Sequence, residues 1–289
     1  MEQNQTIYDF LTSYFNAHQT EMVDMLQTFV NTRSNTGNPA QTNQMASILC
    51  QELEALGCKC TIYSAGEQAG QVVEATLGDD TAQQPVLFSG HYDTVALPGE
   101  HPFYQDSAGN FHGLGVLDMK GGIVIAIWAV KALLAYGWKD RPIRFLFVGD
   151  EESGHCHGNA KELILKYAKG ALCAFNMETG LLSNAICVGR KGTGLFHITV
   201  HGVAAHSGNN WTQGRSAITE MMYKIAEINE LTNLAEDTTV TVTTIQGGTV
   251  LNSVPPICSC TVDLRYRKQE ERERVIDTIK VICENNTVD

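Results

Sequence analysis

The chain of 289 residues is long enough for one large domain or two ordinary ones, and its hydrophobic content of 43% with 7 prolines suits a protein that buries a core. Its 32 acidic and 20 basic side chains give a formal net charge of −12. This excess of acid argues against nucleic acid or an anionic membrane as a partner, because both are bound by clustered Lys and Arg.

The first 30 residues lack the basic start, apolar core and cleavage site of a secretory signal, and no apolar run is long enough to cross a membrane. The nine cysteines are scattered without zinc-ribbon spacing. We therefore expect reduced thiols with structural roles and a cytoplasmic location.

Helices and strands are expected to alternate through the first two thirds of the chain. Helical spacing of apolar residues predicts one or two helices over 6–30 and another over 42–56, ending at Gly57. A long apolar helix is predicted over 121–136. Strands are predicted at 58–63, 72–77, 85–89, 143–148 and 171–177. This alternation favours an α/β sandwich around a central sheet.

The pattern changes near residue 190. Residues 196–200 and 239–244 alternate apolar and polar side chains, which is typical of a sheet with one solvated face. Helices are predicted at 214–230 and 270–284, with a strand at 257–265 between them. The order β-α-β-β-α is one strand short of a ferredoxin-like α+β domain. We expect two domains, residues 1–189 and 190–289.

Two segments place chemically useful side chains after predicted strands or before the apolar helix. In SGHYDTV, His91 and Asp93 are two residues apart and so point the same way on an extended chain. A metal-bound imidazole usually donates its other N–H to a carboxylate, and Asp93 is placed for that role. In GLGVLDMKGG, Asp118 could bridge two cations, although alone it is more simply interpreted as a helix N-cap.

Two further segments add acids at strand ends. GDEESG places Asp150, Glu151 and Glu152 directly after a buried strand, where a cation would relieve their repulsion, although a solvated acidic turn explains them equally well. NMETG places Glu178 after another strand. Imidazole and carboxylate ligands without Cys suit zinc, and several converging carboxylates suit two metals about 3.5–4 Å apart. A remaining Glu of the pair could then serve as general base.

In order and spacing, these four motifs closely resemble the metal-site motifs of the M20 metallopeptidases. That family includes glutamate carboxypeptidase, aminoacylase, acetylornithine deacetylase and succinyl-diaminopimelate desuccinylase. The resemblance runs from about Val23 to the last residue. It implies a zinc-peptidase-like three-layer α/β sandwich with a central mixed sheet, and an inserted ferredoxin-like α+β lid or dimerisation domain. It also implies a homodimer formed through that lid.

The resemblance assigns a role to each motif residue. The ligands of two divalent ions, Zn²⁺ first and Co²⁺ or Mn²⁺ as alternatives, would be His91, Asp118, Glu152 and Glu178. Asp118 would bridge the ions, with His91 and Glu178 on the first and Glu152 on the second. Glu151 would be the base that moves a proton from the bridging water to the leaving amine, with Asp93 supporting His91. A cis peptide is expected at Asp118–Met119.

The second domain carries the remaining matches. RKGTGLFHITVHGVAAHSG resembles the start of the family's lid, and His206 matches the lid His that reaches the partner's active site to stabilise the oxyanion. LNSVPPICSCTVDLRYR matches the lid motif that supplies an Asn and an Arg for substrate binding, here Asn252 and Arg265.

The chain departs from the family at its C-terminal end. Family members return from the lid to complete the catalytic sheet and supply a last His ligand, and no such His follows residue 206. His155 and His157 could be mistaken for ligands, but the family begins a helix there. Both domains are therefore expected to be incomplete, and the polypeptide to hold one metal weakly and turn over poorly.

The resulting hypothesis is a zinc-dependent hydrolase of the glutamate carboxypeptidase branch. It would cleave an amide bond next to a free carboxylate in a small peptide or N-acyl amino acid. An N-acyl amino acid deacylase of the acetylornithine deacetylase or desuccinylase type is the alternative within the family, and a truncated inactive relative is another. A co-catalytic aminopeptidase of a neighbouring family shares the core fold, but the lid segment counts against it.

Overall fold

The computed structural model describes residues 2–180, 183 and 185–288. It divides into two compact units, residues 1–183 and residues 184–289. The assignment of these units to a catalytic and a lid domain stays a prediction.

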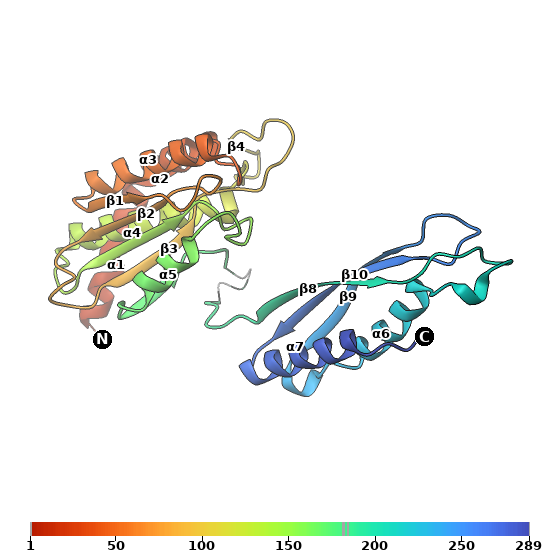
Figure 1. Cartoon of the computed structure of the whole chain (residues 1–289). Helices are drawn as coiled ribbons and strands as arrows, with labels where there is room; N and C mark the ends of the chain where they lie inside the picture. Colours follow the sequence, from red (N-terminus) through yellow and green to blue (C-terminus); the bar gives the residue numbers. More distant parts are fainter. Residues whose placement is uncertain (1, 181–182, 184, 289) are drawn as a thin grey trace. The chain divides into compact units, whose positions relative to one another are not determined.

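The first unit is built on a five-stranded mixed sheet with the strand order β1-β2-β6-β3-β7. Figure 1 shows β1, β2 and β3 of this sheet. Its strands are β1 (Lys59–Tyr63), β2 (Val72–Leu77), β3 (Val86–His91), β6 (Ile143–Val148) and β7 (Cys173–Asn176). The pairs β1–β2 and β2–β6 are antiparallel, whereas β6, β3 and β7 run parallel. The carboxyl ends of three strands therefore meet at one edge of the sheet, which is where ligands bind in sheets of this kind.

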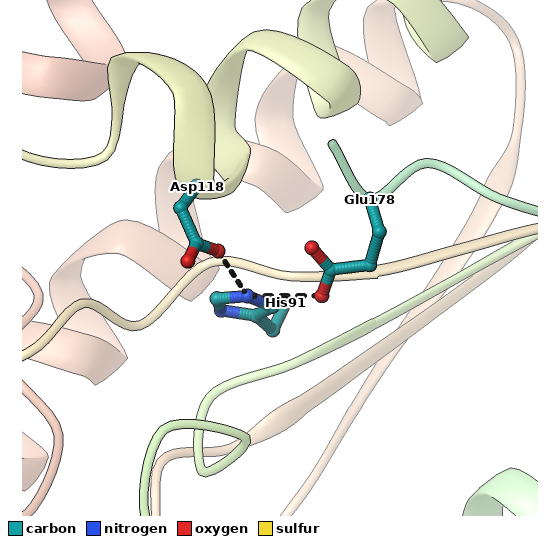
Figure 2. Close-up of side chains that lie close together, drawn as sticks. All are labelled: His91, Asp118 and Glu178. Carbon is teal, nitrogen blue, oxygen red and sulfur yellow. Dashed lines mark hydrogen bonds and ion pairs between the residues drawn. The ribbon is translucent and has the colours of Figure 1, made fainter. Parts of the chain in front are cut away.

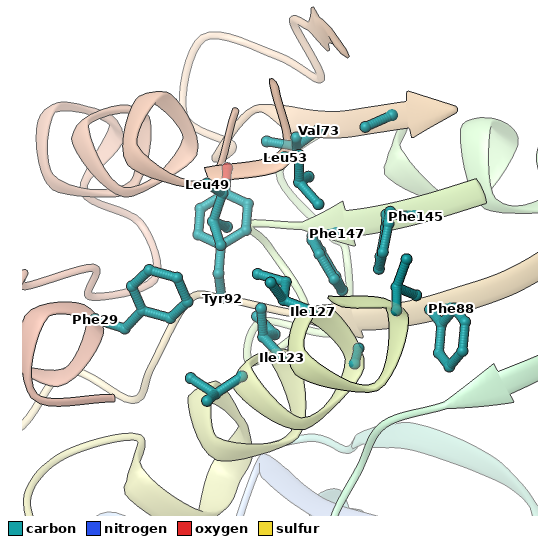
Figure 3. Packing of buried hydrophobic residues seen from close by; sticks show 14 of the residues in the cluster. Phe29, Leu49, Leu53, Val73, Phe88, Tyr92, Ile123, Ile127, Phe145 and Phe147 are labelled. Carbon is teal, nitrogen blue, oxygen red and sulfur yellow. The ribbon is translucent and has the colours of Figure 1, made fainter. Parts of the chain in front are cut away.

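Helices cover both faces of this sheet. They are α1 (Glu2–Ala17), α2 (Gln19–Asn31), α3 (Pro39–Ala55), α4 (Gly121–Tyr136) and α5 (Ala160–Ala168). On one face, Phe29 of α2, Leu49 of α3 and Ile127 of α4 belong to the same buried cluster as Phe145 and Phe147 of β6 (Figure 3). On the other face, α5 packs against Leu146 and Val148. The three layers follow from the apolar β6 strand, which has no solvated side.

Three of the local differences from the sequence-based expectations lie in the first unit. The helix expected at 42–56 begins earlier, at Pro39, because the side chain of Asn38 caps it by accepting a hydrogen bond from the amide of Gln41. The strand expected at 85–89 continues to His91. A short hairpin of β4 (Tyr104–Gln105) and β5 (Phe111–His112) was not expected.

The second unit is a three-stranded antiparallel sheet in the order β8-β10-β9. It contains β8 (Gly192–His201), α6 (Ala217–Asn229), β9 (Thr239–Gly247), β10 (Ile257–Tyr266) and α7 (Gln269–Glu284). Met221 of α6 and Val275 of α7 pack against Val262 and Leu264 of β10 in one buried cluster. This is the order of a ferredoxin-like fold up to its second helix. No helix in the described part of either unit is long and apolar enough to cross a membrane.

Candidate metal centre

Adjacent parallel strands bring three predicted ligands together at the carboxyl edge of the sheet. Ser89 of β3 lies opposite Asn176 of β7, so His91 and Glu178, each two residues further on, end up side by side. The Nε2 atom of His91 is 3.0 Å from Oδ1 of Asp118 and 3.2 Å from Oε1 of Glu178 (Figure 2). One ligand atom from each residue lies within 4.8 Å of the other two. Such a group can hold a cation.

Asp118 reaches this edge from the turn at 116–120 that precedes α4. Within the turn, Asp118 (φ −114°, ψ 96°) and Met119 (φ −134°, ψ 32°) leave helical geometry, and the peptide between them is cis, as predicted. Met119 is fully buried, and its Sδ accepts a hydrogen bond from the amide of His91 at 3.2 Å. A Cβ on Gly122 would lie 1.9 Å from the carbonyl oxygen of Met177, so a glycine is needed where α4 meets the segment after β7.

Asp93 connects the imidazole to the loop of acids that follows β6. Its side chain is fully buried, and Oδ1 lies 3.4 Å from Nδ1 of His91. Nδ1 also lies 3.0 Å from the main-chain oxygen of Asp93. The two carboxylate oxygens accept hydrogen bonds from the amides of Glu151, at 3.2 Å, and Glu152, at 3.1 Å. Asp93 therefore positions the imidazole and the acidic loop together.

Glu151 faces the cluster, whereas Glu152 stands further out. Oε2 of Glu151 lies 3.7 Å from Nε2 of His91. Among the described residues, Glu152 is not in the group whose ligand atoms lie within 4.8 Å of one another. Burial raises the pKa of Glu151 and of Glu152, and the charge of Asp118 raises both pKa values further. Burial and the neighbouring carboxylates thus disfavour the charged form of both acids, and a bound cation would favour it.

The pKa of His91 indicates that this edge of the sheet favours positive charge. Burial lowers the pKa of His91, but hydrogen bonds to Asp93 and Glu178 outweigh that effect and raise the pKa to about 11. The surrounding carboxylates thus favour a positive charge at this position. The donors are one imidazole nitrogen and carboxylate oxygens without sulfur, a set that fits zinc or a similar divalent ion.

The two histidines behind the acidic loop do not join the ligand group in the described chain. Nδ1 of His157 instead donates a hydrogen bond to the buried carboxylate of Asp150 at 2.8 Å. His155 lines a cavity of about 190 Å³ together with His91, Glu151 and Glu178. Sequence reasoning treated Asp150 only as one of three acids that a cation would stabilise and rejected His157 as a ligand, so it missed the hydrogen bond between these two residues.

The three predicted lid residues lie in the second unit, with His206 and Asn252 near the start of β10 and Arg265 near its end. Nδ1 of His206 accepts hydrogen bonds from the amides of Gly208 and Asn209, both at 3.1 Å. A bridge between His206 and Ser253 places Asn252 beside this turn, before β10 begins. Arg265 lies near the far end of β10, where its Nε donates to Asp263 at 2.9 Å. One chain therefore brings His206 and Asn252 together, but not Arg265.

Comparisons with known proteins match both units. Residues 188–289 match the family model of the peptidase dimerisation domain, and residues 71–185 match the model of peptidase family M28. Carboxypeptidase G2 of a Pseudomonas species is 26% identical over 268 residues, which cover 91% of this chain and 64% of that protein. A probable carboxypeptidase of Paracoccidioides lutzii is 31% identical over 216 residues, covering 66% of this chain and 47% of its own length. The chain thus spans less than two thirds of these relatives.

Solved structures show the same fold. A tripeptidase from Staphylococcus aureus has a TM-score of 0.74 at 18% identity, covering 93% of this chain and 74% of its own. An M20 family metallo-carboxypeptidase from Sulfolobus solfataricus has a TM-score of 0.69 at 17% identity, covering 93% and 77%. The first unit matches the model of peptidase family M28 and the second unit matches the peptidase dimerisation domain, while carboxypeptidase G2 aligns with 91% of the chain and so with both units. Together these comparisons support the assignment of the chain to the M20 family of metallopeptidases.

Proposed function

We propose that the protein is a metal-dependent hydrolase that cleaves an amide or peptide bond next to a free carboxylate, in the manner of a glutamate carboxypeptidase. The observation that carries this proposal is the meeting of His91, Asp118 and Glu178 within 4.8 Å of one another, with Glu151 3.7 Å from the same imidazole nitrogen. The similarity to carboxypeptidase G2 supports the choice of substrate class.

The ligands divide between two divalent ions, with Zn²⁺ as the expected metal and Co²⁺ or Mn²⁺ as alternatives. His91 and Glu178 would hold the first ion, Glu152 the second, and Asp118 would contact both. When bound, such ions polarise the scissile carbonyl and lower the pKa of water. Glu152 would have to turn toward Asp118 from its present position outside the close group.

Glu151 is proposed as the general base. It accepts a proton from the attacking water as the water oxygen bonds to the carbonyl carbon, and it returns that proton to the nitrogen as the C–N bond breaks. Burial raises the pKa of this carboxyl toward the value that both transfers need. Asp93 keeps Glu151 in place through the hydrogen bond that it accepts from the Glu151 amide.

The second unit is proposed to complete the site in a homodimer. His206 would donate a hydrogen bond to the developing oxyanion of a substrate bound by the partner, and Asn252 would accompany it, because both lie at one end of β10. Arg265 lies eight residues along from the start of β10, about 26 Å away at the usual rise per residue. Arg265 would therefore serve a different substrate from the one contacted by His206 of the same chain.

The test compares the wild-type chain with Glu151→Gln in the presence of Zn²⁺. Hydrolysis of dipeptides ending in Glu and of N-acyl amino acids is followed by amine release, and bound metal is measured by equilibrium dialysis. We expect Glu151→Gln to lower turnover by about 10²–10⁴-fold with metal retained. The exposed Glu162 of α5 offers the control Glu162→Gln, which should leave turnover unchanged.

Two results would decide against parts of this proposal. Undiminished turnover in Glu151→Gln would remove the base, and a wild-type chain that binds no divalent metal would remove the hydrolase assignment. Preference for N-acyl amino acids over peptides would instead indicate a deacylase.

A further inference from the structure

A second buried carboxylate lies directly before the proposed base. Asp150 is fully buried, and Oδ1 accepts the hydrogen bond from Nδ1 of His157 at 2.8 Å. Oδ2 accepts a second hydrogen bond from the amide of His157 at 3.2 Å, and Ser153 donates its hydroxyl to Oδ1. A carboxylate removed from water needs such donors, and His157 supplies two of them.

The loop that provides these donors is itself anchored. The main-chain oxygen of Asp150 accepts the amide of His155 at 2.8 Å. A Cβ on Gly158 would lie 1.9 Å from the carbonyl oxygen of Ala65, and the amide of Asn159 donates to that oxygen at 2.8 Å. His157 therefore stands on a backbone that is packed against the segment between β1 and β2.

The main chain of residues 150–152 is consequently held from two directions. Asp93 accepts the amides of Glu151 and Glu152 on the side of the metal centre, while Asp150 is tied to His157 on the other side. We propose that His157 is a positioning residue, which acts through Asp150 to keep the carboxylates of Glu151 and Glu152 directed at the metal centre. This inference rests on the proposed function.

The imidazole of His157 is only 31% exposed, yet no ligand role explains it. If the ring N–H of His157 is removed, the buried carboxylate of Asp150 has fewer hydrogen-bond donors, and it is more stable where water can reach it. Movement of Asp150 shifts the two following residues, whose amides then separate from Asp93. The Asp150–His157 pair thus affects the direction of two side chains: that of Glu151, the proposed base, one residue after Asp150, and that of Glu152, the proposed ligand of the second metal, two residues after it.

The test uses three variants of the whole chain. His157→Ala removes the ring donor, whereas His157→Asn keeps an N–H close to the position of Nδ1. His112→Ala is the matched control, because His112 makes a similar contact with Asp106, at 2.9 Å, in the β4–β5 hairpin. Amide hydrogen exchange of Glu151 and Glu152 is measured without metal, and Zn²⁺ affinity is measured by competition with a chromophoric chelator.

In His157→Ala we expect these two amides to exchange about tenfold faster and Zn²⁺ to bind about tenfold more weakly. His157→Asn should restore both values, and His112→Ala should match the wild type. Wild-type exchange in His157→Ala, or failure of His157→Asn to rescue it, would overturn the positioning role, as would faster exchange with unchanged Zn²⁺ affinity. A wild-type chain that binds no Zn²⁺ would count against the proposed function, while the exchange rates would still decide whether His157 holds the loop.

Discussion

Replacing Asp93 by Asn tests how the metal centre is supported, because the substitution changes one oxygen into an NH₂ group and leaves the shape nearly unchanged. Both oxygens of Asp93 face N–H donors, from Glu151 on one side and Glu152 on the other, and Oδ1 also faces His91. Whichever way the Asn amide turns, its NH₂ group meets one of these donors. No rotation of the Asn side chain therefore offers a hydrogen-bond acceptor to both amides.

The expected magnitude follows from those contacts. Each hydrogen bond to a charged group contributes about 1.5–3 kcal/mol, and a buried donor left without an acceptor costs about 1–3 kcal/mol. Asp93→Asn loses one acceptor and the charge on the other, so the free energy of unfolding of the first unit should fall by about 3 kcal/mol. Loss of a group that orients a ligand His typically weakens metal binding about 10–100-fold.

The assay combines urea unfolding of the metal-free chain with Zn²⁺ competition titration. Asp106→Asn is the control, since Asp106 also accepts backbone amides, from Ala108 and Asn110 at 2.9 Å each, but lies in the β4–β5 hairpin. It should leave Zn²⁺ affinity unchanged. If Asp93→Asn binds Zn²⁺ as tightly as the wild type, the idea that Asp93 aligns His91 and the acidic loop is wrong.

Two further predictions concern other parts of the chain. Gly122→Ala places a Cβ 1.9 Å from the carbonyl oxygen of Met177, so it should cost about 1–3 kcal/mol and weaken Zn²⁺ binding, whereas Gly170→Ala, with nothing within 4 Å, should be neutral in urea unfolding. In the second unit, Nζ of Lys224 lies 2.9 Å from Oε1 of the buried Glu220. The substitution Lys224→Met leaves this carboxylate without its ion-pair partner and should destabilise the unit by about 3–5 kcal/mol. Burial raises the pKa of Glu220, but hydrogen bonds from Lys224 and the amides of Val288 and Thr287 outweigh this and place the pKa below 4.5. The contribution of ionised Glu220 to the free energy of unfolding is therefore present above about pH 4.5 and is lost as the pH falls through the lower pKa of the folded state. Unfolding curves of the wild type and Glu220→Gln that coincide at every pH would contradict this prediction.

Much of the secondary structure could be predicted from local pattern. The apolar run of β6 and the helix at 121–136 were expected at the residues where they occur, because continuous apolar sequence of those lengths leaves few alternatives. The start of α3 was placed too late, since its capping residue Asn38 and Pro39 lie outside the apolar periodicity. The β4–β5 hairpin was missed because its two-residue strands are too short to show alternation.

The sequence by itself determined which side chains are candidates for the metal centre: an imidazole and several carboxylates following apolar strands, in motifs that resemble one family. Only the tertiary structure decided that His91, Asp118 and Glu178 meet, because the pairing of β3 with β7 joins residues far apart along the chain. It likewise decided that Asp93 holds the acidic loop and that His157 reaches Asp150. Hydrogen bonds of this kind join a side chain to a distant main-chain amide or to another side chain, and no periodicity or spacing in the sequence encodes them.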